Sequence, residues 1–330
     1  MPNGTKYALA LLPNVGRRGE HNDAQQLTPD MTTWVGSLSD VIEPSELEHW
    51  KEWLGSLQWE QHTRGRRMVL VTMPSERPEV IDHENDQLRN RIARAWYGLL
   101  LAAPLHPVQG EARCVTGEVQ SLDPAPRLHS IRDEGGFGKA SRPLYASSEG
   151  FTSNSPWRTP DLWFDRWVYW TSIVDQAFAV GLPDIIDVAL FAFRMALGRG
   201  RLEFSIPEFI RTAECILAVP AQNGGRKVFA QRALQIAPDL GQHWYIDTKT
   251  LRERFQALYQ HRSDCVHGKV PFAVLRQQGK EGVEEASRLE FLAEALAREA
   301  LRHALSDPTK FPLFDDRNTL EDAWANRQYP

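Results

Sequence analysis

The sequence predicts a mainly α-helical protein in which a C-terminal helical bundle follows an N-terminal α+β region of unassigned fold. From about residue 160 onward, apolar residues recur at the three- and four-residue spacing of amphipathic helices. Before residue 104, short apolar runs typical of strands are mixed with helical patterns. Residues 104–160 are rich in Pro, Gly and Ser, which is typical of a linker. We therefore expect an N-terminal region over 1–155, a helical domain over 156–306 and an irregular tail over 307–330.

The N-terminal region is expected to contain both strands and helices. Residues 6–12 and 68–73 are apolar runs close to Pro or Gly, and each predicts a short buried strand. The helical spacing of Leu and Trp residues predicts helices over 44–57 and 86–103. Weak strands are expected within 112–122. No pattern in this region indicates a particular fold.

Six helices are predicted in the C-terminal half. The third begins at Ser205, because Ser205 and Glu208 form a capping-box pair and Pro207 lies in the first turn. The fifth ends at Gly268, with Pro271 shortly beyond, since both residue types interrupt helices. The predicted ranges are 162–180, 182–197, 205–219, 226–237, 248–267 and 282–305.

The composition excludes several classes of protein. Three cysteines, Cys114, Cys215 and Cys265, lie far apart, which argues against a disulfide framework and a zinc site. No secretory signal opens the chain and no apolar stretch has the length of a membrane span, so we expect a cytoplasmic protein without a membrane partner. The sequence also lacks phosphate-loop, dinucleotide-binding and His-Glu-x-x-His patterns, so we expect no cofactor and no metal.

Positive charge is concentrated in one part of an acidic chain. The formal net charge is −5, yet residues 221–280 hold ten Lys or Arg residues and four Asp or Glu residues. Such a region is compatible with a polyanionic ligand. A solvated helix face with the same residues would look similar in sequence, and charge alone leaves both interpretations open.

Arg262 occupies an unexpected position in the fifth predicted helix. At about 100° per residue, Leu251, Phe255, Leu258 and Cys265 fall on one apolar stripe, and Arg262 lies in its middle. A guanidinium on an apolar face is unfavourable unless it is paired or faces a cleft. Packing gives no reason for this residue, which makes it a candidate functional group.

His267 follows in the same segment, immediately before Gly268. On an ideal helix it points about 140° away from Arg262. The two side chains can share a site only if the helix end is distorted or if a second chain supplies one of them. His267 could also serve simply as a capping residue, because His is favourable near the last carbonyls of a helix.

The segment that contains these residues is similar to the signature of HEPN domains, in particular of the Apea-like branch. In that branch an Arg is followed a few residues later by a His, and the match includes Tyr259, Arg262-Ser263 and Val266-His267-Gly268. Residues 209–217, with Glu214, resemble an earlier helix of the branch, and 227–233 resemble the helix between them. The resemblance covers roughly residues 205–270.

The resemblance implies a helical bundle that dimerises with its Arg and His motifs facing each other, and a metal-independent endoribonuclease. In such an enzyme the RNA 2′-hydroxyl attacks the adjacent phosphate. We assign His267 the general acid or base role, since His has a reference pKa of about 6.5. Arg262 would bind the phosphate and stabilise transition-state charge. Asp264 would orient or polarise the site, although it could equally be a solvated acid.

The remaining candidate residues are expected to support the site. Glu214 would pair with Arg262, and Tyr259 and Ser263 would lie at the edge of the site, where Tyr259 could equally be a core residue. Lys269 and Arg254 are candidates for RNA binding. The expected partners are RNA, with tRNA as a candidate, and a second copy of the chain that completes the active site.

Two functions from different classes follow from these residues. The first is a ribonuclease that acts as a toxin-like or anti-phage defence effector, with the N-terminal region as sensor or regulator. The second is a non-catalytic HEPN module that dimerises and binds nucleotide or RNA without cleaving it. A metal-dependent hydrolase fits poorly, because His261 and His267 have the wrong helical spacing for one metal ion.

Overall fold

The computed structural model describes the backbone of residues 161–329 apart from 198–201, 221–223 and 244–245. Before residue 161 it describes short strands, Leu27 and helical positions between 94 and 102. The described part of the chain is mainly α-helical, as predicted. The predicted domain boundary at 155, the helix over 44–57 and the weak strands within 112–122 lie outside the described residues.

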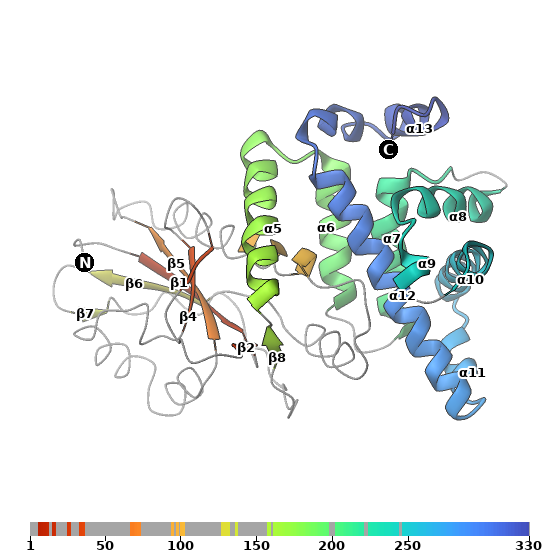
Figure 1. The fold of residues 1–330 in the computed structure, drawn as a ribbon, viewed down its shortest axis with the longest axis horizontal. Helices are drawn as coiled ribbons and strands as arrows, with labels where there is room; N and C mark the ends of the chain where they lie inside the picture. The colour runs from red at the N-terminus through yellow and green to blue at the C-terminus, as the bar shows by residue number, and fades with distance from the viewer. Residues whose placement is uncertain are drawn as a thin grey trace. The chain divides into compact units, whose positions relative to one another are not determined.

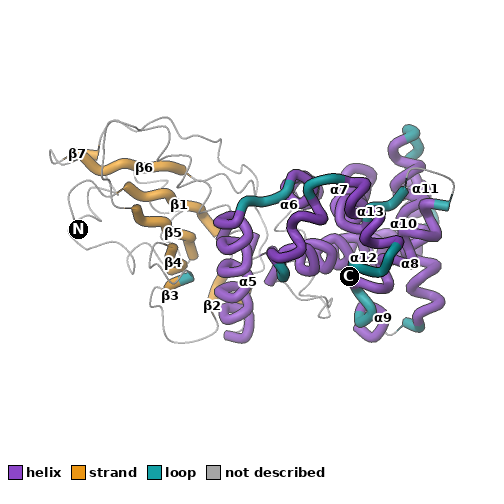
Figure 2. Tube along the Cα trace, turned by 90° about the horizontal axis from the view of Figure 1, so that it is seen from above, coloured by secondary structure: helices purple, strands orange, loops and turns teal. Residues whose placement is uncertain are grey.

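Tertiary contacts divide the chain into two compact units, which we describe separately. One unit comprises Met1–Ala103 and Asp123–Asp175, and the other comprises Pro104–Leu122 and Gln176–Pro330. The first contains the strands, drawn in orange in Figure 2, and the second contains the helices that follow α5 (Asp161–Val180).

The described strands of the first unit form a six-stranded sheet and a separate two-stranded one. In the larger sheet β1 pairs antiparallel with β5 on one side and β6 on the other, in the order β3-β4-β5-β1-β6-β7. The smaller sheet pairs β2 and β8 in parallel. The strands are β1 (Lys6–Leu12), β2 (Val15–Arg17), β3 (Gln25–Gln26), β4 (Thr33–Gly36), β5 (Arg67–Met73), β6 (Arg127–Arg132), β7 (Gly136–Phe137) and β8 (Trp157–Thr159).

Two of these strands coincide with predicted ones, and three others correct a prediction. β1 and β5 lie where the sequence predicted strands over 6–12 and 68–73. The stretch 104–160, predicted as linker and loop after 122, contains β6, β7 and β8. The pattern of β6 is mostly polar, so its place in the sheet depends on main-chain pairing with β1. Such pairing leaves little trace in hydrophobic periodicity.

In the first unit α5 packs closely against the helical segment between residues 94 and 102. Trp167 is buried, and its indole N–H donates a hydrogen bond of 2.7 Å to the carbonyl of Ala95. The backbones approach so closely at Gly98 that a Cβ there would lie 2.2 Å from the hydroxyl of Thr171. This contact explains why a glycine stands within a helix otherwise rich in large apolar residues.

The second unit is a helical bundle in which α7 is the central helix, in contact with α6, α10 and α12 (Figure 1). Its core combines many Ala, Leu and Ile side chains with six fully buried phenylalanines, Phe193, Phe209, Phe229, Phe255, Phe272 and Phe314. The helices are α6 (Asp184–Leu197), α7 (Leu202–Leu217), α8 (Gly225–Ile236), α9 (Leu240–His243), α10 (Thr248–Val266), α11 (Pro271–Arg276), α12 (Lys280–Leu305), the 3-10 helix η1 (Pro308–Phe314) and α13 (Arg317–Ala325).

Periodicity located α6, α8, α10 and α12 to within two residues, but it misplaced the start of α7 and missed the short helices α9 and α11. The capping-box pair predicted a start at Ser205, whereas the helix begins at Leu202. Ser205 is buried, and its hydroxyl donates to the carboxylate of Glu290 on α12, so it does not cap α7. Packing against α12 therefore overrides the local capping signal.

No helix in the described part is long and apolar enough to cross a membrane.

The segment predicted as an irregular tail over 307–330 is largely helical, which corrects the prediction. Asp307 and Asp316 cap η1 and α13, each accepting a hydrogen bond from a backbone N–H two or three residues later. Leu320 and Trp324, four residues apart, bury one face of α13. The capping Asp residues and this spacing are helix signals, but the many Pro and polar residues around them hid the pattern.

Candidate functional site

Arg262 lies on the apolar stripe of α10, as predicted, but at its buried end and not in its middle, because Cys265 beyond it is only half-buried. Leu251, Phe255 and Leu258 of this stripe are fully buried, while the side chain of Arg262 is 32% exposed. Its Nη2 atom lies 3.1 Å from Oε2 of Glu214, which projects from α7 and is 14% exposed. The predicted pair between these two residues is therefore present. It satisfies the guanidinium on an otherwise apolar face and leaves part of it accessible.

The pKa of Glu214, the carboxylate that pairs with Arg262, is set by opposing effects. Burial raises the pKa of the Glu214 carboxyl above its ordinary value. The guanidinium of Arg262 opposes this rise, and so do Arg317 of α13, the hydrogen bond from the Tyr259 hydroxyl, and Arg211. One carboxylate thus connects residues from α7, α10 and α13.

Tyr259 takes part in the same cluster from one turn before Arg262. Its hydroxyl donates to Glu214, and burial, together with the Glu214 charge, raises the pKa of Tyr259. Its ring packs 5.2 Å from that of Phe229 on α8. The first residue of α8 is Gly225, where a Cβ would lie 2.9 Å from the Tyr259 hydroxyl. The close approach of α8 thus helps to place this hydroxyl against Glu214.

The chain that follows Glu214 is held by one side chain from α8, that of Arg232. Arg232 donates from Nη1 to the carbonyls of Leu217 and Ala218, at 2.7 and 2.6 Å. Ala218 has a φ of 45°, in the left-handed region that ends the helix. These bonds satisfy two carbonyls that the end of a helix leaves without intrahelical partners.

Two side chains from α13 hold the same end of α7. The indole N–H of Trp324 donates to the carbonyl of Ile216 at 3.1 Å, and Nη2 of Arg317 donates to that of Val219. The Arg232 guanidinium lies 5.0 Å above the Trp324 ring. Nothing in the sequence signalled these roles, because each contact joins segments far apart in the chain.

His267 ends α10 in a well-defined geometry. It is the C-cap residue, and Gly268 beyond it has a φ of 77°. The N–H of Gly268 donates to the carbonyl of Cys265 at 3.0 Å, and that of Lys269 to the carbonyl of Asp264 at 2.9 Å. This pair of bonds is a Schellman motif, which requires a residue such as Gly at the left-handed position. The motif fixes the backbone of His267.

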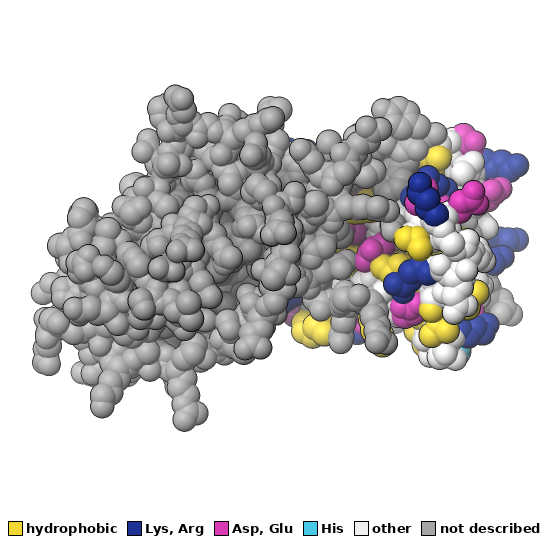
Figure 3. Space-filling view, turned by 90° about the horizontal axis from the view of Figure 1, so that it is seen from below, with side chains coloured by type: hydrophobic (Ala, Val, Ile, Leu, Met, Phe, Trp, Pro, Cys, Tyr) yellow, Lys and Arg dark blue, Asp and Glu magenta, His cyan; other side chains and the backbone are white. Residues whose placement is uncertain are grey.

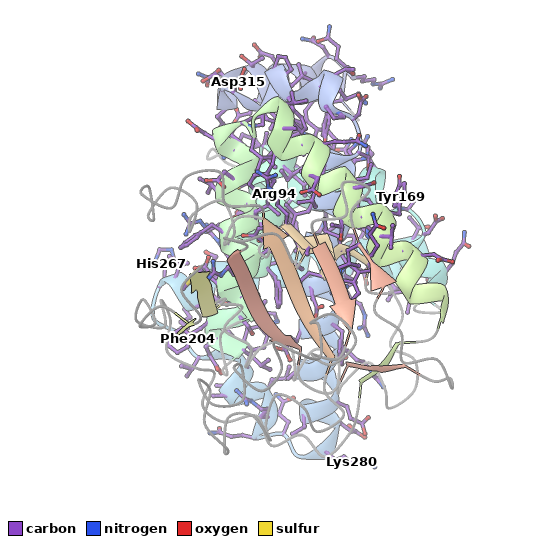
Figure 4. All side chains as sticks on the ribbon, turned by 90° about the vertical axis from the view of Figure 1, so that its left-hand side faces the viewer. Arg94, Tyr169, Phe204, His267, Lys280 and Asp315 are labelled. Atoms are coloured by element: carbon purple, nitrogen blue, oxygen red, sulfur yellow. The ribbon has the colours of Figure 1, made fainter. Side chains whose placement is uncertain are left out.

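The His267 side chain, labelled in Figure 4, is exposed, and no contact joins it to Arg262 among the described residues. α10 is regular up to Val266, so the angle of about 140° between the two positions is retained. The structure therefore brings Glu214, Tyr259 and Arg262 together and leaves His267 apart from them within one chain.

Asp264 makes contacts different from those expected of a catalytic residue. Its Oδ1 accepts hydrogen bonds from Lys269 at 2.9 Å and from Gln260 at 3.2 Å. The bond from Lys269 is the main cause that lowers the pKa of Asp264 below its ordinary value. Asp264 and Lys269 thus reinforce the end of α10, next to His267. Ser263 contributes a carbonyl that accepts from the His267 N–H at 3.1 Å.

Several of the basic residues in 221–280 form ion pairs within the second unit. Arg254, a candidate for RNA binding, lies 3.5 Å from Glu285 of α12, and Arg276 lies 3.2 Å from Glu203 of α7. In the face drawn in Figure 3, Lys and Arg side chains are mixed with Asp and Glu. Among the described basic residues of 221–280, four are exposed and have no ion pair: Arg226, Lys227, Lys249 and Arg252.

The other groups near the site have ordinary structural roles. The His261 ring packs 5.2 Å from that of Phe272, and burial lowers the pKa of His261. Burial raises the pKa of the Cys265 thiol to about 11, so the thiol stays protonated near neutral pH. Among the described residues, no group of three or more His, Cys, Asp or Glu side chains is placed to hold a metal ion.

No family model matches the sequence, and neither a search of curated proteins nor one of solved structures returned a significant match. The likeness to HEPN domains therefore depends on the residues of α7, α8 and α10 alone.

Proposed function

We propose that this protein is a metal-independent endoribonuclease of the HEPN type, acting in the cytoplasm as a toxin-like or anti-phage defence effector. The observation that carries the proposal is Arg262, a partly exposed guanidinium at the end of an apolar stripe, held by the largely buried Glu214. A bundle built only for packing has no need of this pair, because neutral apolar residues would fill the same space at lower desolvation cost.

The residue types suit cleavage by the RNA 2′-hydroxyl. This oxygen attacks the adjacent phosphorus, its proton passes to a base, and the 5′-oxygen leaves with a proton from an acid. His267 would transfer these protons, since an imidazole ring has one nitrogen that can accept a proton and one that can donate a proton. Arg262 would bind the non-bridging phosphate oxygens and stabilise the negative charge that builds on them.

The separation of Arg262 and His267 in one chain makes a second copy part of the proposal. A homodimer that places Arg262 of one protomer opposite His267 of its partner would complete two equivalent sites. Arg226, Lys227, Lys249 and Arg252 remain available for the RNA backbone. The N-terminal region would act as sensor or regulator.

A non-catalytic module that dimerises and binds nucleotide or RNA is the second candidate. The observation in its favour is that Glu214 already neutralises Arg262, while His267 has no contact that orients its ring among the described residues. Such a protein would bind RNA with a strong dependence on salt and leave it intact.

Cleavage of labelled RNA in EDTA distinguishes the two candidates. We expect wild-type protein to cut, and Arg262→Ala, His267→Ala and His267→Gln each to lower the rate by at least about 100-fold, because each removes a group from the transition state. Glu253→Gln, on the same helix but exposed and given no role in the site or in RNA binding, is the matched control and should retain most activity.

Growth of bacteria that overexpress the same variants provides a second readout, with toxicity expected only from wild type and from Glu253→Gln. Cleavage that persists in His267→Ala, or that depends on a divalent metal, would contradict the mechanism. Binding of RNA by wild type with no cleavage under any condition would favour the second candidate.

A further inference from the structure

The carboxyl end of α7 is an unusual helix end, because side chains from two other helices take up its carbonyls in succession. Trp324 of α13 donates to Ile216, and Arg317 of α13 donates to Val219. Between them, Arg232 of α8 donates to two further carbonyls. Cationic donors at a helix C-terminus also interact favourably with the helix dipole. The last turn of α7 is thus held by α8 and α13.

This last turn follows directly on Glu214. The carboxylate of Glu214 reaches Arg262 at 3.1 Å, so a shift of the last turn would move Arg262 as well. Arg317 also acts on Glu214 through its charge, in addition to its bond to Val219. The α13 helix, dark blue in Figure 1, therefore has both a mechanical and an electrostatic connection to the site.

We propose that α13 is a working part of the candidate site, and that Arg317 and Trp324 are positioning residues that hold Glu214 and Arg262 in place. The role in cleavage rests on the proposed ribonuclease function, whereas the positioning of the two side chains does not. Displacement of the C-terminal segment would release the end of α7 and leave Arg262 without a fixed partner.

The charges around Glu214 determine what substitution of Arg317 should do. Arg262 and Tyr259 face the carboxylate from α10, Arg317 from α13 and Arg211 from its own helix. The cations favour the ionised form, while burial disfavours it. Removing the Arg317 charge should therefore raise the pKa of Glu214 further and weaken its hold on Arg262.

Three variants of Arg317 and Trp324 distinguish the effect of the Arg317 charge from the effect of the hydrogen bonds to α7. A fourth variant controls for general damage to α13. Arg317→Met removes charge and donors with little change in size, while Arg317→Lys keeps the charge. Trp324→Phe removes one donor and keeps an aromatic ring in the core. Arg327→Met is the matched control, since Arg327 is exposed in the same segment and its side chain has no described partner.

Two NMR measurements on the full chain test the positioning without any assay of activity. The carboxyl ¹³C signal of Glu214, assigned with Glu214→Gln, should titrate at higher pH in Arg317→Met than in wild type, and Arg317→Lys should reverse most of the shift. Exchange of the Arg262 Nε–H should be faster in Arg317→Met and Trp324→Phe. Arg327→Met should match wild type in both measurements.

An unchanged Glu214 titration in Arg317→Met, or an unchanged Arg262 exchange rate in both variants, would overturn the proposal. Kinetics then test the role in cleavage: we expect kcat to fall about 10- to 100-fold with little change in KM, because a misplaced group loses orientation more than binding. A wild-type protein that does not cut RNA would refute the proposed function, and the two NMR results would still decide the positioning.

Discussion

Glu214 concentrates the chemistry of the site in one residue. Its carboxylate is largely buried, it pairs with Arg262, and it accepts a hydrogen bond from Tyr259. Burial nevertheless prevails over its cationic neighbours and raises the pKa of Glu214. Keeping the Glu214 carboxylate ionised next to Arg262 therefore lowers the stability of the fold. Such a cost is typical of residues kept for function and not of residues that only fill the core.

The raised pKa of Glu214 predicts how stability depends on pH. A carboxyl whose pKa is raised in the folded state stabilises most below its unfolded value of 4.5, and this contribution is lost as pH rises through the folded value. Glu214→Gln removes this loss, so the stability of the variant relative to wild type should increase as pH rises above 4.5. Urea unfolding at several pH values measures the difference.

Glu208→Gln is the control for this experiment. Glu208 lies on the same helix and pairs with the more exposed Arg211 at 3.6 Å, so its replacement should change stability by less than about 0.5 kcal/mol. A stability difference between Glu214→Gln and wild type that stays constant with pH would show that burial does not govern this carboxyl.

The contact of Gly225 with Tyr259 makes a second prediction at the scale of single residues. Gly225→Ala would place a Cβ 2.9 Å from the Tyr259 hydroxyl and 3.2 Å from the carbonyl of Pro220. We expect a loss of about 1–3 kcal/mol in unfolding free energy, as for other overpacked sites. Tyr259→Phe removes the obstructing oxygen, so the double variant should recover part of this loss, giving a coupling of about 0.5–3 kcal/mol in a double-mutant cycle. Additive effects would indicate that the backbone of Pro220 is the obstacle.

The end of α10 shows how one element combines structural and functional demands. Gly268 and the bonds of its Schellman motif stop the helix, and Lys269 strengthens the stop by its ion pair with Asp264. The predicted catalytic residue Asp264 and the predicted RNA-binding residue Lys269 thus bind each other. Their effect on His267 is to fix the backbone from which its side chain extends.

Gly268→Ala tests whether the position of His267 matters. Gly268 has a φ of 77° and Gly181, which follows α5, has a φ of 101°, and a Cβ at either would meet no other heavy atom within 4 Å. Both Ala variants should therefore lose a similar amount of stability, about 1–2 kcal/mol, from backbone strain alone. Only Gly268→Ala should lower the cleavage rate, and equal rates for the two variants would argue against a role for the helix end.

Oligomerisation is the question at the scale of the whole molecule. A site shared between protomers predicts that inactive Arg262→Ala and His267→Ala chains complement each other when they are coexpressed. Half of the dimers would be mixed, and each would contain one intact site, so activity should return to about one quarter of wild type. Chains that carry both substitutions, coexpressed with either single variant, provide the control without recovery. Failure to complement would place both groups in one chain or exclude the mechanism.

Local patterns in the sequence determined much of this protein. The spacing of apolar residues located α5, α6, α8, α10 and α12 to within two residues, because each helix buries one continuous face. The same spacing marked Arg262 as misplaced, and Gly268 as a helix stop. The pair of Arg262 with Glu214 could be anticipated because a guanidinium on an apolar helix face requires a partner.

Only the tertiary structure decided how the end of α7 is held. The bonds of Trp324 and Arg317 to α7 span 108 and 98 residues, and no local pattern encodes which distant donor meets a free carbonyl. Ser205 shows the same limit, since packing against α12 turned a capping residue into a buried contact. Periodicity reports which face of a helix is apolar, whereas the choice among possible partners depends on how all the helices pack together.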